Sequence, residues 1–185
     1  MRTLQQPLFT PETEWVPPDR LPDLSSYKEI AIDLETRDPS LTTMGSGAVR
    51  REGEVVGIAI AVEGWSGYFP IAHEGGGNMD RYLVLDWFEE VLHTTSTKIF
   101  HNAMYDVSWI RSLGFQINGG IVDTMVAASL CNENRYSYTL DSDAKEYVGM
   151  GKNEKLLQEA AKDWGINPKA EMWRLPAPFV GEYAE

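Results

Sequence analysis

Two acidic residues, Asp33 and Glu35, stand two positions apart directly after the apolar segment Ile30-Ala31-Ile32. Positions two apart in a β-strand point to the same face, so both carboxylates should project side by side. Two such groups repel each other unless a proton or a cation lies between them. Paired hard oxygen ligands of this kind suit Mg²⁺ or Mn²⁺. The pair predicts a divalent-metal site at the end of a buried strand, although an Asp-x-Glu triplet also occurs on solvated faces.

A third acidic residue, Asp106, ends the segment His101-Asn102-Ala103-Met104-Tyr105-Asp106. The segment follows a predicted strand and opens a predicted helix, so Asp106 falls in the first helical turn, where the helix dipole favours a carboxylate. A plain helix-start residue is one interpretation. The other is a metal ligand, because α/β folds place their sites where strands lead into helices. On the second interpretation Asn102 and Tyr105 contact a substrate strand, the tyrosine by stacking on a base.

Hydrophobic periodicity predicts the elements that must position these residues. The predicted strands are 29–34, 54–62, 67–72 and 97–100, and the predicted helices lie around 83–92, 107–113, 124–130, 140–148 and 156–164. Asn78 or Asp80 can cap the first helix and Asp123 the third. Residues 37–53, rich in Ser, Thr, Gly and Pro, are predicted as a loop. Three successive strands imply an antiparallel start, and strand–helix alternation follows, so the fold class is α/β: a mixed sheet flanked by helices, compatible with a ribonuclease H-like arrangement.

The chain has 185 residues, of which 43% are hydrophobic, and this suits one globular domain. Residues 1–23 contain five prolines and no signal-peptide core, so we expect an extended lead-in before a domain at 24–185. The single cysteine, Cys131, allows no internal disulfide, is expected to be buried, and fits a reducing cytoplasm. No apolar run is long enough to span a bilayer. The sequence makes no prediction of the oligomeric state.

The acidic segments together resemble two motifs of DEDD nucleases. Asp33-x-Glu35-Thr36 is similar to the first exonuclease motif, and Asn102-x-x-Tyr105-Asp106 is similar to the second motif as it appears in family A (Pol I-like) DNA polymerases. The segment from Pro70 to Asn78 also resembles phage and prophage versions of this domain. The resemblance covers nearly everything from Leu24 onward. It implies a ribonuclease H-like fold and a 3′–5′ proofreading exonuclease.

The same resemblance implies a mechanism with Mg²⁺ or Mn²⁺, in which two cations about 4 Å apart flank the scissile phosphate. Asp33 would bridge both cations, Glu35 and Asp106 would each hold one, and Tyr183 would orient the attacking water. The product would be a nucleoside 5′-monophosphate cut from a single-stranded DNA 3′ end. Residues expected to contact the substrate are Thr36, Leu41, His73, Asn102 and Tyr105.

The third motif of the family, Tyr-x-x-x-Asp, is only partly present. The sequence ends at Tyr183-Ala184-Glu185, so the expected aspartate would lie two residues beyond Glu185. Tyr183 is typical of the tyrosine subclass, and Glu185 is no credible substitute because its spacing is wrong and it sits at a fraying end. We therefore expect a C-terminally incomplete domain whose polymerase partner is missing from this chain. Its second cation should be held weakly and its activity should be impaired.

The net charge of −12 argues against a stand-alone duplex binder, because affinity for a phosphate backbone normally comes from clustered Lys and Arg. A short single-stranded end gripped through divalent cations requires an acidic pocket instead. Two alternatives stay open. One is an RNA-trimming exonuclease of the same superfamily. The other is a catalytically silent nucleic-acid-binding or scaffolding module, against which the three carboxylates count.

Overall fold

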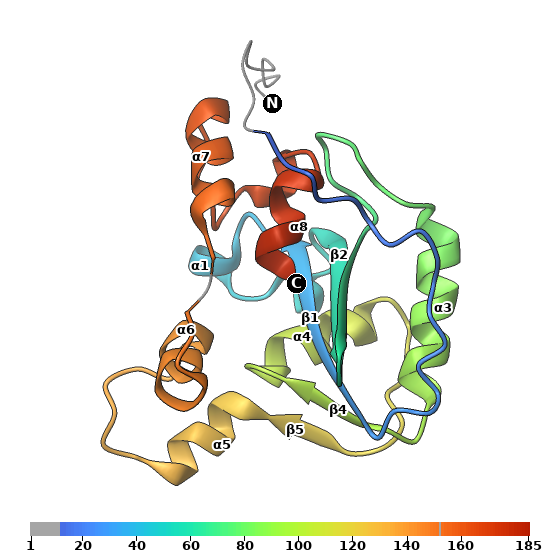
Figure 1. Ribbon diagram of the computed structural model, residues 1–185, viewed down its shortest axis with the longest axis vertical. Coiled ribbons are helices and arrows are strands. Elements are labelled where there is room, and N and C mark those ends of the chain that lie inside the picture. The colour runs from blue at the N-terminus through green and yellow to red at the C-terminus, as the bar shows by residue number, and fades with distance from the viewer. Residues whose placement is uncertain (1–11, 152) are drawn as a thin grey trace.

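The computed structural model describes residues 12–151 and 153–185, and Figure 1 shows a sheet with helices on both faces. The sheet has five strands in the order β3-β2-β1-β4-β5. These strands are β1 (Glu29–Arg37), β2 (Glu54–Val62), β3 (Trp65–Pro70), β4 (Thr97–Phe100) and β5 (Ile121–Asp123). β1, β2 and β3 pair antiparallel, whereas β4 pairs parallel with both β1 and β5. The predicted mixed α/β sheet with an antiparallel start is confirmed.

The helices follow the predicted pattern with four additions. They are α1 (Leu41–Met44), α2 (Gly47–Arg50), α3 (Arg81–His93), α4 (Ala103–Ser112), α5 (Thr124–Cys131), α6 (Leu140–Asp143), the π-helix η1 (Ala144–Val148), α7 (Lys155–Trp164), the 3₁₀ helix η2 (Met172–Arg174) and α8 (Pro178–Ala184). The additions are η2, α8 and the short helices α1 and α2, which lie in the predicted loop. The helix predicted at 140–148 is one α-helical turn that widens into a π-helix.

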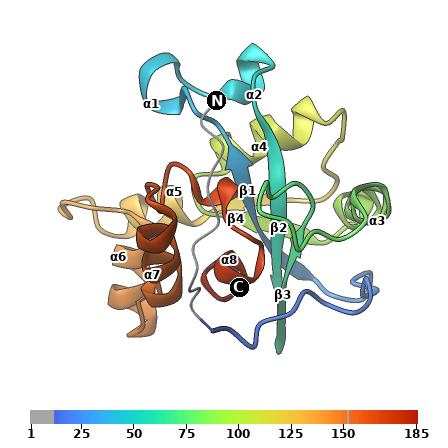
Figure 2. The same cartoon turned by 90° about the horizontal axis from the view of Figure 1, so that it is seen from above.

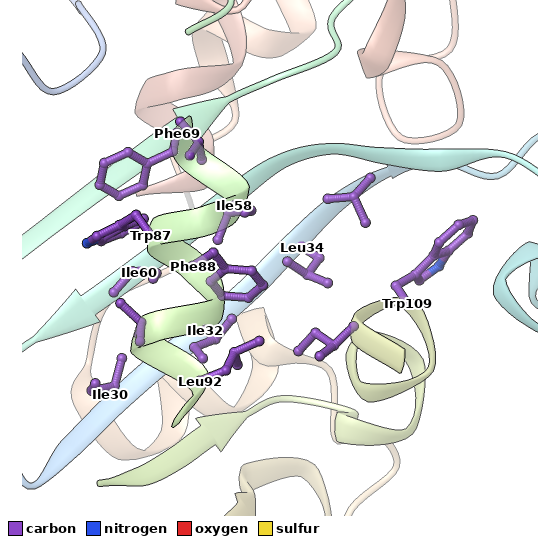
Figure 3. Close-up of a cluster of buried hydrophobic side chains, with 14 of the residues drawn as sticks. Ile30, Ile32, Leu34, Ile58, Ile60, Phe69, Trp87, Phe88, Leu92 and Trp109 are labelled. Atoms are coloured by element: carbon purple, nitrogen blue, oxygen red, sulfur yellow. The ribbon is translucent and has the colours of Figure 1, made fainter. Parts of the chain in front are cut away.

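One face of the sheet carries the larger hydrophobic core, built around α3. Ile32 and Leu34 of β1 pack with Phe88 of α3 in this cluster, as Figure 3 shows. The helix begins where Asp80 accepts hydrogen bonds from the N–H groups of Tyr82 and Leu83, which satisfies donors that a helix start otherwise leaves free. The apolar side of α3 packs against β1 and β2 in this cluster.

The opposite face is covered by α7 and α8, which Figure 2 shows on the side away from α3. A second buried cluster joins Leu157 of α7 and Phe179 of α8 to Tyr68 of β3 and Ala59 of β2. Helix α7 ends at Gly165, which takes the left-handed conformation (φ 64°) that favours glycine at this position. Two cores thus enclose the sheet, and β1 lies between them.

The described part of the lead-in, 12–23, contains no helix or strand and follows the surface of the domain. The indole N–H of Trp87 donates to the carbonyl of Pro22 at 2.8 Å, which ties the segment to α3. Residues 1–11 of the predicted lead-in lie outside the described residues. Cys131 is exposed, so its predicted burial was wrong; it ends a helix that buries little of its surface. No helix in the described ranges is long and apolar enough to cross a membrane.

Candidate active site

The two carboxylates of β1 occupy the face opposite the α3 core. Ile32 and Leu34 are buried against α3, so the alternation of a strand turns Asp33 and Glu35 to the other side. Glu35 is 9% exposed and Asp33 is half-buried. The register between β1 and β2 shifts between Glu35 and Thr36, an irregularity of the kind that re-aims side chains beside active sites. The strand conformation of β1 therefore places Asp33 and Glu35 on the same face, as predicted.

Asp106 reaches the same strand from α4. β4 pairs with β1 only through Glu29–Ala31, so beyond Ala31 the edge of β1 is free of a neighbouring strand on that side. At this edge, Oδ1 of Asp106 accepts a hydrogen bond from the backbone N–H of Leu34 at 3.1 Å. Leu34 lies between Asp33 and Glu35 in the chain, and Asp106 is only 2% exposed. The structure therefore brings the third acidic residue to the segment that carries the first two.

The surroundings of Asp106 favour either a proton on its carboxyl group or a cation beside it. Burial, and after it the charge of Asp33, raises the pKa of Asp106 to about 8, although the N–H of Leu34 opposes the shift. A carboxyl group in this state is costly to ionise unless positive charge comes close. Carboxylate oxygens are also the hard donors that Mg²⁺ and Mn²⁺ prefer. The residues present fit a divalent cation in chemistry.

The fit is incomplete in geometry. Within 12–151 and 153–185, no group of three or more His, Cys, Asp and Glu side chains is arranged to hold a metal ion. The electrostatic interaction between Asp33 and Asp106 supports a shared site, whereas the convergence of Asp33, Glu35 and Asp106 on one ion stays a prediction.

Asp123 positions α4 and hence Asp106. The sequence predicts it as the cap of α5, and its carboxylate does accept the N–H groups of Met125 and Val126. It also accepts the N–H groups of Asn102 and Ala103, at 3.0 and 2.9 Å, where α4 begins. Burial would raise the pKa of Asp123, but these four donors outweigh it and lower the pKa below its usual value. One carboxylate therefore fixes the starts of two helices, a role that the sequence did not reveal.

Three of the expected substrate contacts, Thr36, Asn102 and Tyr105, surround the edge of this site. The hydroxyls of Thr36 and Tyr105 are 2.6 Å apart, which joins the end of β1 to α4. Asn102 precedes α4 with a left-handed backbone (φ 67°), and its side chain makes no capping hydrogen bond. Their contact with a substrate strand stays a prediction.

Tyr183 lies near the site, on α8. It lines a cavity of about 500 Å³ together with Asp33, His101 and Val148. Glu185 also lines this cavity, but its carboxylate accepts the indole N–H of Trp15 at 3.0 Å and the backbone N–H of Tyr68 at 3.1 Å. These bonds hold Glu185 to the lead-in and to β3, in agreement with its rejection as a metal ligand.

The other two expected substrate contacts, Leu41 and His73, come from α1 and from the loop after β3. Leu41 begins α1 and is 40% exposed, so it remains available to a ligand. His73 is 3% exposed and its Nε2 is 2.6 Å from the hydroxyl of Tyr68. Because the ring is enclosed, the structure contradicts the expectation that His73 touches a substrate strand. Tyr68 itself is buried on the carboxylate face, a placement that nothing local in the sequence indicates.

Comparison with known proteins identifies relatives in sequence. The family model of the DNA polymerase A exonuclease, described as a 3′–5′ exonuclease, matches residues 12–185. A DNA-directed DNA polymerase of Pseudomonas phage M6 is 42% identical over 193 residues, which is 100% of this chain and 29% of that protein. The chain thus spans about three tenths of the length of this relative.

Solved structures share the fold at low identity. Escherichia coli RNase D, an exoribonuclease involved in structured RNA processing, superposes with a TM-score of 0.53 and 15% identity, covering 86% of this chain and 36% of that one. Brucella melitensis NrnC with bound Mg²⁺ gives a TM-score of 0.52 and 20% identity, covering 76% of this chain and 68% of the other. These likenesses show that the fold is ribonuclease H-like, as predicted.

Proposed function

The chain belongs to the family of 3′–5′ exonuclease domains of family A DNA polymerases, and on this premise we propose that it trims the 3′ end of single-stranded DNA as a proofreading unit. The observation that carries the proposal is the bond from Leu34 to Asp106, which supports a cluster of Asp106 with Asp33 and Glu35. The products would be nucleoside 5′-monophosphates.

In the proposed mechanism Asp33, Glu35 and Asp106 hold divalent cations, Mg²⁺ or Mn²⁺. Bound cations would lower the pKa of the attacking water and neutralise charge developing on the phosphate. Tyr183, which lines the same cavity as Asp33, would orient the attacking water through its hydroxyl. Thr36, Asn102 and Leu41 would contact the terminal nucleotides, and the ring of Tyr105 would stack on a base. No side chain needs to act as a nucleophile.

The proposed partners are a single-stranded DNA 3′ end and a polymerase domain. The relative from Pseudomonas phage M6 is a DNA-directed DNA polymerase, and 71% of its length lies outside the match, since this chain spans 29% of it. A polymerase domain would supply the basic surface for duplex DNA that a chain of net charge −12 lacks. We place the protein in the cytoplasm, where such a polymerase would work.

A single-turnover assay with protein in excess tests the proposal. A 5′-labelled single-stranded oligodeoxynucleotide with Mn²⁺ should shorten stepwise from its 3′ end and release nucleoside 5′-monophosphates. Asp33→Asn should abolish the shortening. Internal cuts, or equal shortening by Asp33→Asn, would refute the proposal.

Two further measurements separate the alternatives. An oligoribonucleotide of the same sequence should be shortened more slowly, and a preference for it would favour an RNA-trimming enzyme. Absence of Mn²⁺ binding in a calorimetric titration would favour the silent scaffolding module.

A further inference from the structure

A buried tyrosine–histidine pair lies on the carboxylate face of the sheet, and the proposed mechanism gives it no task. Tyr68 is fully buried and His73 is 3% exposed. The hydroxyl of Tyr68 is 2.6 Å from Nε2 of His73, and the two rings meet edge to face at 75°. Two polar groups in a core require each other, since a buried donor or acceptor that loses its partner keeps the full cost of its desolvation. An apolar pair would fill the same space without that requirement.

Strand register directs Tyr68 toward the acidic residues. Asp33 pairs with Ala59 of β2, and Ala59 pairs with Tyr68 of β3, so the three stand in one row across the sheet. Paired residues point to the same face. Tyr68 therefore projects on the side of the sheet that carries Asp33 and Glu35, under α8.

A glycine lets the hydroxyl reach the position beside Glu35. Gly57 of β2 is the register partner of Glu35. A Cβ atom on Gly57 would collide with the hydroxyl oxygen and the ring of Tyr68. Glycine inside a strand weakens it and often marks the close approach of another group. The ring of Tyr68 thus crosses β2, and its hydroxyl lies over Gly57, the residue that pairs with Glu35.

The loop after β3 holds the histidine firmly. The backbone N–H of His73 donates to Oδ1 of Asn78 at 2.7 Å, and Nδ2 of Asn78 donates back to the carbonyl of His73 at 2.8 Å. Gly76 accepts the N–H of Ala177, which fastens the loop to the start of α8. The hydrogen bonds with Asn78 and with Ala177 therefore fix the loop that carries the ring of His73.

The charges of the site act on this pair. Burial, and after it the charges of Glu35 and Asp33, raises the pKa of Tyr68 well above its usual value, so the phenol keeps its proton. Burial also lowers the pKa of His73 to about 4, against the carbonyls of Leu175 and Met172, so the ring is neutral near pH 7. A neutral hydroxyl group thus stands within electrostatic reach of two carboxylates.

We propose that Tyr68 is a positioning residue for Glu35, and that His73 orients the Tyr68 hydroxyl for this task. The inference rests on the proposed function, because it assigns Glu35 to a metal ion. Partners behind metal ligands orient those ligands, and their loss typically lowers metal affinity or activity about 10- to 100-fold. Because the pair is buried, its loss should affect kcat and metal affinity and leave KM for DNA unchanged.

The test compares variants of the full 185-residue chain by Mn²⁺ titration calorimetry, single-turnover cleavage and thermal unfolding. Tyr68→Phe keeps the ring and removes the hydroxyl, and it should raise the Kd for Mn²⁺ about 10-fold with KM for DNA unchanged. Tyr82→Phe, at an 80% exposed tyrosine of α3, is the matched control and should bind Mn²⁺ like the parent.

Histidine variants keep the test decisive even if Tyr68→Phe fails to fold. His73→Gln places an amide nitrogen near the position of Nε2 and should retain Mn²⁺ affinity within about 3-fold, whereas His73→Leu should lose about 10-fold. A purely structural role predicts the reverse order, since leucine suits an apolar core. Parental affinity and rate in both Tyr68→Phe and His73→Leu would overturn the inference.

The proposed function has its own control in the same titration. Asp33→Asn should weaken Mn²⁺ binding strongly. If it does not, the metal site itself fails. If Asp33→Asn weakens binding and Tyr68→Phe does not, only the positioning role fails.

Discussion

Strand β1 shows two faces with opposite chemistry. Ile32 and Leu34 point into the core beneath α3, where they pack in a cluster of buried apolar side chains. Asp33 and Glu35, from the same four-residue segment, point to the side of α8, where charge, a buried phenol and a cavity meet. The first face holds the strand in place, and the second can then carry repelling carboxylates that contribute little to stability themselves. Substitutions on the two faces should therefore have separable effects.

The largest effect on stability is expected on the apolar face. Phe88 of α3 is fully buried against β1, and Phe88→Ala should lower the free energy of unfolding by about 3–5 kcal/mol through lost burial and a cavity. Leu83→Ala, on the same helix at 62% exposure, is the control and should change it by less than about 0.5 kcal/mol. Urea unfolding measures both, and equal losses would contradict the assignment of the core face.

The second effect lies on the other face and depends on pH. The folded-state pKa of His73 is lowered to about 4 by burial, whereas an unfolded histidine titrates near 6.5. As pH falls below 6.5, the unfolded chain binds a proton that the folded protein cannot accept until pH approaches 4. Stability present above pH 6.5 is therefore lost between pH 6.5 and 4, by up to roughly 3 kcal/mol.

His73→Gln removes this titration, so its stability should fall less than that of the parent over the same pH range. Urea midpoints at pH 7, 5.5 and 4.5 measure the difference between the two proteins. His93→Gln, at an exposed histidine, serves as the control. Parallel pH profiles for the parent and His73→Gln would show that the ring can accept a proton inside the folded protein.

The third effect concerns the link that brings Asp106 to β1. Asp123→Ala removes acceptors from the starts of α4 and α5 and should cost about 2 kcal/mol, at the upper end for a lost cap. Asp80→Ala removes the cap of α3 alone and should cost about 1 kcal/mol. Thermal unfolding compares the two.

Asp123→Ala should also weaken Mn²⁺ binding, because α4 carries Asp106, whereas Asp80→Ala should not. Equal Mn²⁺ affinities for these two variants would contradict a positioning role of Asp123.

The smallest effect is expected at the edge of the site. Tyr105→Phe removes the 2.6 Å bond to Thr36 and should cost about 0.5–1.5 kcal/mol of stability. The ring remains, so any stacking on a base is preserved and DNA affinity should change less than with Tyr105→Ala. Fluorescence anisotropy with a labelled single strand measures this order, and equal losses would exclude stacking.

Local patterns in the sequence were sufficient for most elements. The strands predicted at 54–62 and 97–100 match at both ends, because polar and turn-forming residues bound each of them. Asp80 is the cap of α3, one of the two candidates, and Gly165 ends α7. By contrast, β5 was missed, since three residues after two glycines carry no period and become a strand only by pairing with β4.

The sequence by itself determined the pairing of Asp33 with Glu35 on one face of a strand, since that follows from a two-residue period. It also placed Asp106 in the first turn of a helix. Only the tertiary structure decided that this turn meets the free edge of β1, because the bond from Leu34 joins residues 72 positions apart. The tertiary structure also decided that His73 is buried against Tyr68 and that Glu185 accepts a hydrogen bond from Trp15. Each contact joins segments that meet only after the sheet has formed and the helices have packed on it.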